Sequence, residues 1–252
     1  MGVLNVTPDS FSDGGRFDQL ATAIVQGQAL AGEGADILDI GGESTRPGHT
    51  PVDAETEVAR VVPVIAALAP GLGIPISIDT SKASVAAAAL GAGACIVNDV
   101  WGLQRDPLMS AVCAAHGADV ILMHNRAAVD AAIDIVDDIL AFLDRSLALA
   151  RRAGIAEARI TLDPGIGFGK TPAQSLAALR AIPRLKAMGF PVLVGASRKA
   201  VIGHVTGRAT PDRLAGTLAV HLWAVAAGAE IIRAHDVAAH RDGLAVQAAL
   251  AQ

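Results

Sequence analysis

Two groups of residues in this sequence are of the types that hold a phosphate group and a metal ion. Arg233 and His235 follow a short apolar run and precede a stretch of helical character. A helix N-terminus offers free backbone N–H donors and a favourable dipole to phosphate. Asn5, Asp9 and Asp13 supply oxygen ligands that suit Mg²⁺, which usually keeps several waters and bridges phosphate oxygens. For Asp9 and Asp13 the alternative is ordinary turn chemistry.

The elements that must position these groups are predicted by the spacing of apolar residues. Short β-branched runs alternate with longer Ala-rich helical stretches, and near-continuous apolar runs favour parallel strands covered by helices. The expected strands are Val3–Leu4, Ile37–Ile40, Ile76–Ile78, Ile96–Val97, Val120–Met123, Ile160–Leu162, Val192–Val194 and Ile231–Ile232. The expected helices include Gln19–Glu33, Ala54–Leu68, Ile133–Ala153 and Arg213–Ala227, and Gly154, Gly189 and Gly228 fall where helices should stop.

Eight strand–helix units predict a closed (β/α)8 TIM barrel, an α/β fold, as a single domain over residues 1–252 rather than an open sheet. Barrel enzymes carry their sites on the loops that follow the strands. Polar residues follow all eight expected strands. A helix cap or a turn could explain any one of them, but not easily all eight, so we expect the active site at the C-terminal ends of the strands.

Five motifs at these strand ends resemble the signatures of the dihydropteroate synthase family, in that family's order and over essentially the whole chain. They are the loop from Asn5 to Gly15, the run Gly-Glu-Ser-Thr-Arg-Pro-Gly ending at Gly48, Asp-Pro-Gly-Ile-Gly-Phe-Gly-Lys ending at Lys170, Ser-Arg-Lys ending at Lys199, and Arg-x-His ending at His235. The resemblance implies a transferase of folate biosynthesis and a target of sulfonamides. Its reaction would condense 6-hydroxymethyl-7,8-dihydropterin pyrophosphate with 4-aminobenzoate to give 7,8-dihydropteroate and diphosphate.

The resemblance also assigns residues to the substrates. A pterin presents an edge of fused donors and acceptors, which carboxylate and carboxamide partners can read, each charged hydrogen bond contributing about 1.5–3 kcal/mol. Asp163 would accept from the ring N–H and the exocyclic amine, the alternative being a turn Asp before Pro164. The implied pterin-binding residues are Asp79, Asn98, Met123, Asp163, Phe168, Gly195 and Lys199.

The second substrate needs a flat apolar slot with a cation near its carboxylate, although Phe168 has plain packing as its alternative. The implied 4-aminobenzoate residues are Phe11, Thr45, Arg46, Pro47, Phe168, Ser197 and Lys199. Diphosphate would contact Asn5, Arg46, Arg233 and His235, and the metal would be Mg²⁺ on Asn5, Asp9 and Asp13. The catalytic residues would be Asp79, Asp163, Lys199 and Arg233.

The resemblance implies a dissociative mechanism. Diphosphate leaves first, with Mg²⁺ and Arg233 stabilising the developing charge and Asp79 facing the developing pterin cation. The neutral amine then attacks, and proximity supplies much of the rate. After the fifth strand the sequence reads Met123-His-Asn-Arg and lacks the longer Gly-x-Pro-x-x-Met continuation often seen there, so Met123 is expected only as a possible pocket wall. His124 and His204 are expected as loop or helix-surface residues.

Three rival functions remain at this point. A methyltetrahydrofolate methyltransferase that serves a corrinoid protein could share the pterin pocket, but it would not need Arg46, Arg233 and His235. A Schiff-base lyase would use Lys199 as its nucleophile beside Arg198. A catalytically silent pterin-binding protein would bind pterin without releasing diphosphate.

Composition and charge argue against nucleic-acid-binding, membrane and secreted proteins. The formal net charge is −5 and no cluster of five or more basic residues occurs, so nucleic-acid binding is unsupported. The mean hydropathy is +0.45, but Pro and Gly interrupt the longest uncharged run, Val61 to Ile78, which is unlike a membrane span. No secretory signal is visible, so a cytoplasmic enzyme is expected, and the resemblance suggests a homodimer. Cys95 and Cys113 are expected to be buried, reduced thiols.

Overall fold

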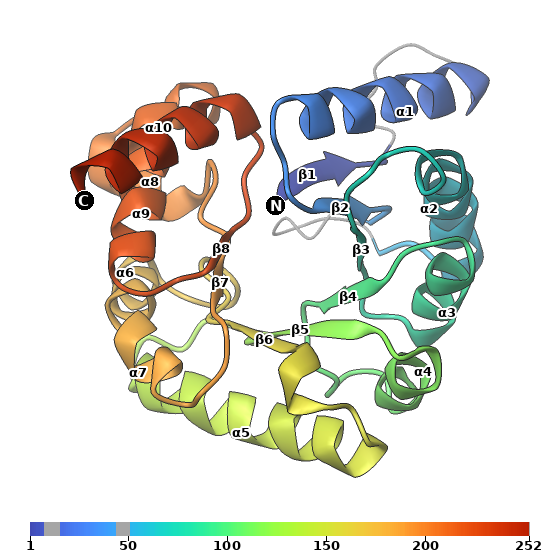
Figure 1. Cartoon of the computed structure of the whole chain (residues 1–252). Coiled ribbons are helices and arrows are strands. Elements are labelled where there is room, and N and C mark those ends of the chain that lie inside the picture. Colours follow the sequence, from blue (N-terminus) through green and yellow to red (C-terminus); the bar gives the residue numbers. More distant parts are fainter. Residues whose placement is uncertain (8–15, 44–50, 252) are drawn as a thin grey trace.

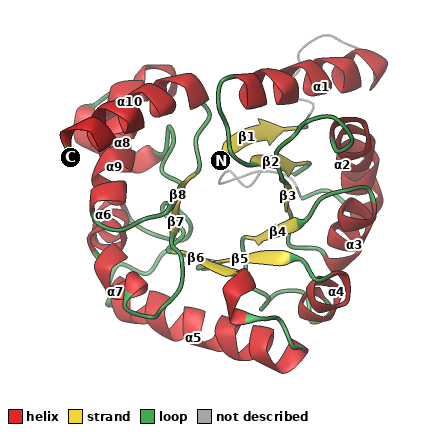
Figure 2. Cartoon of the chain, viewed as in Figure 1, coloured by secondary structure: helices red, strands yellow, loops and turns green. Residues whose placement is uncertain are grey.

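The computed structural model describes residues 1–7, 16–43 and 51–251. In this part of the chain, short parallel strands form an inner ring and helices surround it (Figures 1 and 2). The strands are β1 (Gly2–Asn5), β2 (Leu38–Gly41), β3 (Ile76–Asp79), β4 (Ile96–Asp99), β5 (Asp119–Met123), β6 (Ile160–Asp163), β7 (Leu193–Val194) and β8 (Ile231–Ile232). All eight expected strands are confirmed to within two residues at either end.

The outer layer contains ten α-helices in the described residues. They are α1 (Arg16–Gly32), α2 (Ala54–Leu68), α3 (Ala83–Gly91), α4 (Met109–His116), α5 (Ile135–Ala153), α6 (Pro172–Arg180), α7 (Ile182–Lys186), α8 (Ala200–Thr206), α9 (Leu214–Ala226) and α10 (Val237–Leu250). Short 3₁₀ turns, η2 (Glu157–Arg159) and η3 (Thr210–Asp212), precede β6 and α9. No helix among them is long and apolar enough to cross a membrane.

Pairing between strands closes the ring. Strands β1 to β6 pair in chain order, and β7 pairs with β8. Single bridges join the two sheets, Leu162 with Val192 on one side and Gly2 with Ala234 on the other. The described strands therefore form a closed, all-parallel (β/α)8 barrel, as the sequence predicts.

Two apolar layers support the ring. The larger one packs between the strands and the helices and includes Leu4, Ile40, Ile78 and Leu162, all wholly buried. The smaller one lies inside the barrel, where Ile96, Ile121 and Leu193 pack with Met1, Ile37 and Ile231. Side chains alternate between the two layers along each strand. The inward-facing residues nearer the C-terminal strand ends are the ones that carry the polar groups.

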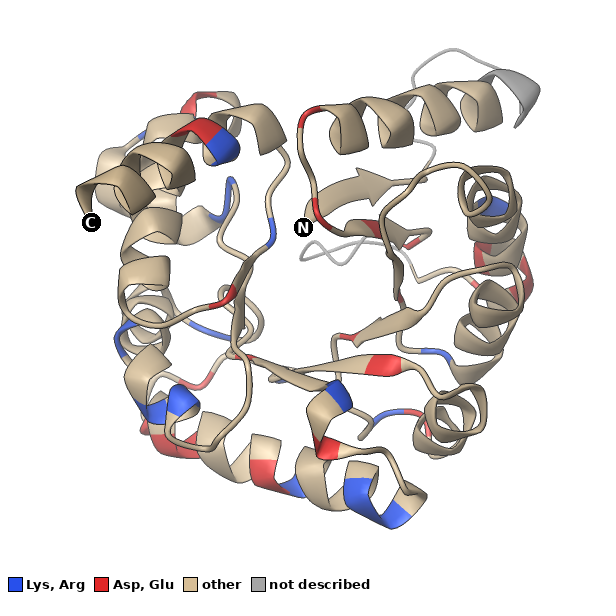
Figure 3. Ribbon diagram, viewed as in Figure 1, with Lys and Arg blue, Asp and Glu red and all other residues tan. Residues whose placement is uncertain are grey.

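Local sequence signals fix several helix ends. Asp134 accepts the backbone N–H groups of Val136 and Asp137 at the start of α5, and Gly154 ends that helix in the left-handed conformation. Acidic residues lie in the first turn of α5 and basic ones in its last turn, which complements the helix dipole (Figure 3). Thr171 and Gln174 form a reciprocal capping box before α6.

One expectation about the cysteines is wrong. Both are free thiols, and Cys113 is buried in α4, but Cys95 is exposed. Cys95 stands one residue before β4, at the N-terminal end of the barrel, so the apolar run that contains it begins before the buried part of the strand.

Candidate active site

The expected polar residues meet at one level of the barrel. Asn5 pairs in register with Gly41, Gly41 with Asp79, and Asp79 with Asn98. Met123 pairs with Asp163 across β5 and β6. Because the strands are parallel and in register, these side chains share the C-terminal edge of the ring.

Arg233 connects this group across the barrel. Its Nε donates to Asp39 Oδ2 at 2.5 Å, and its Nη2 donates to Asp79 Oδ2 at 2.7 Å. Asn98 Nδ2 also donates to Asp39 Oδ2, at 3.1 Å. Residues from β2, β3, β4 and the end of β8 are thus joined in one buried network.

The sequence reasoning missed Asp39. Its side chain is wholly buried, yet it stands inside the apolar run that marks β2 rather than after it. The available signal was a lone acidic residue in a buried strand, which requires a cationic or hydrogen-bonding partner.

Several oxygens of this network have no partner among the described residues. They are Asp39 Oδ1, Asp79 Oδ1, Asn98 Oδ1 and the neighbouring Ser77 Oγ, all buried. Buried polar atoms are normally hydrogen-bonded, so a row of unpartnered acceptors is the arrangement expected of a site that receives a ligand with several N–H donors.

Charge and burial set the ionisation of the two central groups. Burial raises the pKa of Asp79, while Arg233 opposes the rise and Asp39 adds to it. The pKa of Arg233 lies above its usual value because Asp39 and Asp79 outweigh the cost of its burial. Arg233 is therefore a permanent cation between two carboxylates.

The other side of the pocket is formed by the loop after β6 and the loop after β7. Asp163 Oδ1 accepts the backbone N–H of Gly165 at 2.7 Å. Lys199 Nζ donates to the carbonyl oxygen of Ile166 at 2.5 Å and lies 4.5 Å from the ring centroid of Phe168. Lys199 and Phe168 are thus brought together, as both substrate assignments require.

Burial also shifts the charges on this side. It lowers the pKa of Lys199 to about 8, although Asp163 opposes the shift. It raises the pKa of Asp163, which Lys199 and the Gly165 N–H group oppose. Gly195 leaves space beside these groups, since a Cβ there would lie 3.7 Å from Arg233 Cβ and 4.0 Å from Lys199 Nζ.

Ser197 and His235 also meet. Ser197 Oγ accepts the His235 backbone N–H at 3.2 Å and lies 2.9 Å from His235 Nδ1. Nearby, Arg198 pairs with Asp236 through both Nε and Nη2, at 3.1 and 2.5 Å. These contacts fix the loop after β7 against the residues that lead into α10, the helix expected after Arg233 and His235.

Two buried histidines, His221 and His240, form a chain of hydrogen bonds that begins at Ala196 in the loop after β7. Ala196 N–H donates to His221 Nε2 at 3.0 Å, and His221 Nδ1 lies 2.9 Å from His240 Nε2. His240 Nδ1 in turn lies 2.6 Å from the carbonyl oxygen of Asp236. Both rings are neutral in this chain of bonds, because each uses one nitrogen as a donor and one as an acceptor.

His124 lies in a loop and His204 on a helix surface, as expected, but His124 is buried rather than exposed. His204 is exposed on α8. His124 is wholly buried at the end of β5 and contacts Asp138 and Lys170. Sequence position after a strand suggests a loop residue, but α5 folds back over this strand end and covers it.

Several expected residues lie outside the part of the chain that the structure describes. They are Asp9, Phe11 and Asp13 of the first loop and Thr45, Arg46 and Pro47 of the second. Among the described residues, no group of three or more His, Cys, Asp or Glu side chains could hold a metal ion. Asn5, at the end of β1, is the one expected metal ligand that the described residues include.

Comparison with known proteins agrees with this geometry. Residues 1–235 match the family model described as pterin binding enzyme. The chain is 46% identical to dihydropteroate synthase of Bacillus subtilis over 237 residues, covering 94% of this chain and 83% of the relative. It is 48% identical to dihydropteroate synthase of a Synechocystis species over 246 residues, with 95% and 85% covered.

Solved structures show the same likeness. A Clostridium difficile dihydropteroate synthase crystallised in the presence of pteroic acid is 46% identical, with a TM-score of 0.96 and 99% and 95% of the two chains covered. A Xanthomonas albilineans dihydropteroate synthase with 4-aminobenzoic acid is 46% identical, also with a TM-score of 0.96, and 99% and 92% covered. These matches show that the chain belongs to the pterin-binding enzyme family, among the dihydropteroate synthases, transferases of folate biosynthesis that join a pterin to 4-aminobenzoate.

Proposed function

We propose that the strand-end network binds the pterin pyrophosphate and transfers its pterin-methyl group to 4-aminobenzoate. The observation that carries this proposal is the row of unpartnered acceptors on Asp39, Asp79 and Asn98, which faces Asp163 and Lys199 in a buried site. A pterin offers ring N–H and amine donors in a plane, which such a row can accept. Asp163 keeps Oδ1 on Gly165, so Oδ2 is the oxygen that would accept from the ligand.

The reaction needs little covalent chemistry from the protein. The bond between the pterin methylene and the diphosphate oxygen breaks, its electron pair leaves with diphosphate, and the amine nitrogen then bonds to the methylene and loses a proton. Asp79 and Asp39 are the carboxylates nearest the cationic Arg233. Their charge would stabilise a pterin cation, while Arg233 and His235 would attract the departing diphosphate.

We further propose Mg²⁺ as the metal, with Asn5, Asp9 and Asp13 supplying oxygen atoms. The donor chemistry fits, because Mg²⁺ takes one or two protein oxygens together with phosphate and water oxygens. The support from the described residues is the position of Asn5 at the end of β1, at the same level of the barrel as Asp79. When bound, the ion would neutralise negative charge on the diphosphate.

The 4-aminobenzoate slot would combine the loop after β7 with the two N-terminal loops. In support, Lys199 Nζ lies over the Phe168 ring, and Ser197, two residues before Lys199, contacts His235. Phe11, Thr45, Arg46 and Pro47 would complete it, with Arg46 beside the carboxylate. The related Xanthomonas albilineans enzyme has been solved with 7,8-dihydropteroate, which joins both halves of such a site in one molecule.

A Schiff-base lyase is the second candidate, because burial lowers the pKa of Lys199 to about 8 and so favours an uncharged amine. Against it, Lys199 Nζ is bound to the Ile166 carbonyl and lies over Phe168. Borohydride trapping with a carbonyl substrate would separate the two, since only the lyase would form a covalent adduct.

We also propose a cytoplasmic homodimer. Exposed apolar side chains on α9 and α10, namely Trp223, Val246 and Leu250, support a second copy of this chain as the partner. Sedimentation of the wild type and of Trp223→Glu would test the assembly. A wild-type monomer at micromolar concentration would contradict it.

The decisive test of function is diphosphate release from the pterin pyrophosphate, measured with and without 4-aminobenzoate. We expect release that depends on the amine, with 7,8-dihydropteroate formed in equal amount. A methyltransferase or a silent binding protein would release no diphosphate. Chelation with EDTA should suppress release, and added Mg²⁺ should restore it.

A further inference from the structure

Lys170 ends the motif that follows β6, and the site described above gives it no role. Its side chain is buried, and its Nζ contacts His124 and two carbonyl oxygens of the loop itself. Gly165, Gly167 and Gly169 all have positive φ, between 57° and 82°. The loop therefore turns sharply three times and leaves its carbonyl groups to be satisfied by side chains.

Two lysines hold these carbonyl groups from two sides. Lys199, on the pocket side, donates to the oxygen of Ile166 at 2.5 Å. Lys170 donates to the oxygen of Gly165 at 2.7 Å and to that of Phe168 at 3.1 Å. The conformation that presents Asp163 and Phe168 to the pocket is thus fixed between two cations.

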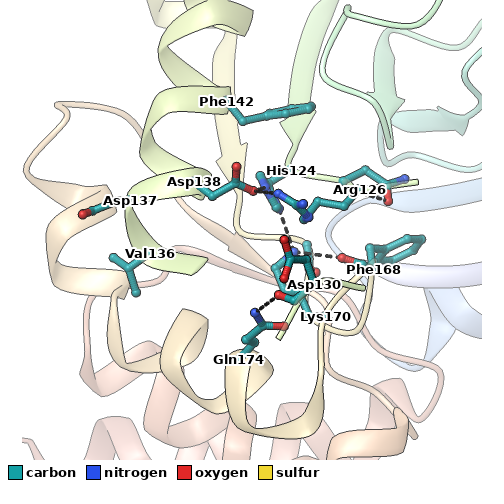
Figure 4. A network of polar contacts seen from close by, with 12 residues as sticks. His124, Arg126, Asp130, Val136, Asp137, Asp138, Phe142, Phe168, Lys170 and Gln174 are labelled. Atoms are coloured by element: carbon teal, nitrogen blue, oxygen red, sulfur yellow. Dashed lines mark hydrogen bonds and ion pairs between the residues drawn. The ribbon is translucent and has the colours of Figure 1, made fainter. Parts of the chain in front are cut away.

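The third contact of Lys170 determines where the protons lie. Its Nζ is 2.7 Å from His124 Nδ1, so the ammonium group has three donors and three acceptors. His124 Nδ1 must then be unprotonated and its Nε2 must carry the hydrogen. Nε2 lies 3.0 Å from Asp138 Oδ2, which also accepts from Arg126 Nη1 at 2.8 Å (Figure 4).

Burial keeps His124 neutral, whereas the charged form of Lys170 is favoured by the three acceptors around its Nζ. Burial, assisted by Lys170, lowers the pKa of His124 to about 4. Burial also lowers the pKa of Lys170, to about 7, and Asp163 and Asp138 oppose that shift while Lys199 and Arg126 add to it. An uncharged lysine amine has two N–H donors, which would leave one of the three acceptors unsatisfied.

We propose that Lys170 is a positioning residue for the pterin half of the active site: oriented by His124 and Asp138, its ammonium group holds the loop from Gly165 to Phe168 in the conformation that aims Asp163 at the substrate. The link is direct, because the Gly165 N–H group is the hydrogen-bond donor that orients Asp163 Oδ1. The inference rests on the transfer reaction proposed above.

The most direct variant is Lys170→Met, which keeps most of the length of the side chain and removes its donors. We expect the KM for pterin pyrophosphate to rise about tenfold or more at saturating 4-aminobenzoate, which is the cost of leaving about one buried carbonyl unsatisfied. We expect kcat to change less than KM, because Lys170 does not contact the reacting atoms. A Lys170→Met enzyme that folds and keeps the wild-type KM would overturn the proposal.

Asp138 provides a second test that does not disturb the core. It lies on α5 with its side chain 29% exposed, and it reaches the loop only through His124 and Arg126. Asp138→Ala should raise the same KM, because His124 is then no longer held in the tautomer that accepts from Lys170. Asp138→Asn retains an acceptor oxygen and should recover most of the wild-type value.

The matched control is Asp137, the preceding residue of α5. It pairs with Arg184 at 3.2 Å and its side chain is 69% exposed, on the side away from the network (Figure 4). Asp137→Ala should leave the KM unchanged. Equal effects at both positions, or no recovery in Asp138→Asn, would mean that the network serves stability alone.

Binding of the pterin alone, measured by calorimetry, distinguishes this inference from the proposed function. If the wild type bound pterin but released no diphosphate from pterin pyrophosphate, the proposed function would fail. The order of the variants in pterin affinity would still test the role of Lys170. Urea denaturation of each variant establishes that it is folded under the conditions of the assay.

Discussion

Asp39 joins β2 to Asn98 of β4 and to Arg233 after β8. It accepts from Arg233 and from Asn98 through the same oxygen, and its side chain is wholly buried. A buried cation is tolerated only when its charge is compensated, so Arg233 requires both of its carboxylates. Asp39 thereby holds Arg233 at the position from which, in the proposed reaction, it would contact the diphosphate.

Asp39→Asn should reduce both stability and pterin-pyrophosphate affinity. The amide can keep an oxygen on Arg233 but removes the negative charge that compensates it, and we expect the free energy of unfolding to fall by about 1–3 kcal/mol. Urea denaturation and calorimetry would measure the two effects. The control is Asp36→Asn, since Asp36 pairs with Arg241 at 3.5 Å with its side chain 79% exposed, and it should cost under about 1 kcal/mol. A similar loss in both variants would contradict the central role of Asp39.

Asp163→Asn should weaken pterin binding with little loss of stability. An asparagine can keep its oxygen on the Gly165 N–H group, which leaves its amide donor facing the donors of the pterin. Titration of pterin into the folded variant would measure the change, expected as a loss of about tenfold or more. Unchanged affinity would show that Asp163 does not read the pterin edge.

At the scale of the elements, the sequence predicts the strands well but does not predict which buried polar side chains pair with one another. Strand ends were visible because Asp79, Asn98 and Asp163 interrupt apolar runs at the point where each strand leaves the core. Asp39 was not visible as a site residue, because its partner Arg233 is distant in sequence. The burial and the partners of His124 could not be predicted for the same reason, since Asp138 and Lys170 reach it only after folding.

The loop after β6 gives a prediction at this scale. A Cβ on Gly165 would lie 1.9 Å from the carbonyl oxygen of His124, and its φ of +65° disfavours other residues. Gly189 has a φ of +89° but nothing within 4 Å of its Cβ position. Gly189→Ala should therefore cost only the backbone strain, about 1–2 kcal/mol.

Gly165→Ala should cost clearly more than Gly189→Ala and should also weaken pterin binding, because the loop must move away from His124. Thermal unfolding of the two variants would separate the backbone strain, which both share, from the steric contact with His124, which only Gly165→Ala makes. Pterin titration would show whether the contact also affects binding. Equal losses of stability would show that the loop can shift away from His124 without cost, and that the close contact at Gly165 contributes no free energy.

For the whole molecule, the histidine pair behind the loop after β7 should make folding sensitive to acid. Burial, assisted by His240, lowers the pKa of His221 to about 3. An unfolded histidine has a pKa of about 6.5, so below that pH the unfolded state binds the proton and the folded state does not. The contribution of the neutral His221 to the free energy of unfolding is therefore fully present above about pH 6.5 and is lost as the pH falls towards 3.

His221→Gln should remove this part of the acid sensitivity. Between pH 7.5 and pH 5 the wild type should lose about 2 kcal/mol more of its free energy of unfolding than the variant does. His124 has a lowered pKa and Asp99 a raised one, and both remain in the variant, so the comparison cancels them. Urea denaturation at the two pH values would measure the difference, and parallel losses in the two proteins would exclude His221 as the cause.

The closure of the ring by the bridge from Gly2 to Ala234 has a consequence for the newborn chain. As the ribosome makes the protein from its N-terminus, β1 is the first of the eight strands to be made, but the segment that covers its open edge arrives only with the last strand. At about 5–20 residues per second, that edge waits on the order of ten seconds or more for its partner. Unpaired strand edges attract other chains, so the long interval between synthesis of the first and eighth strands is the period in which this protein most needs protection by chaperones.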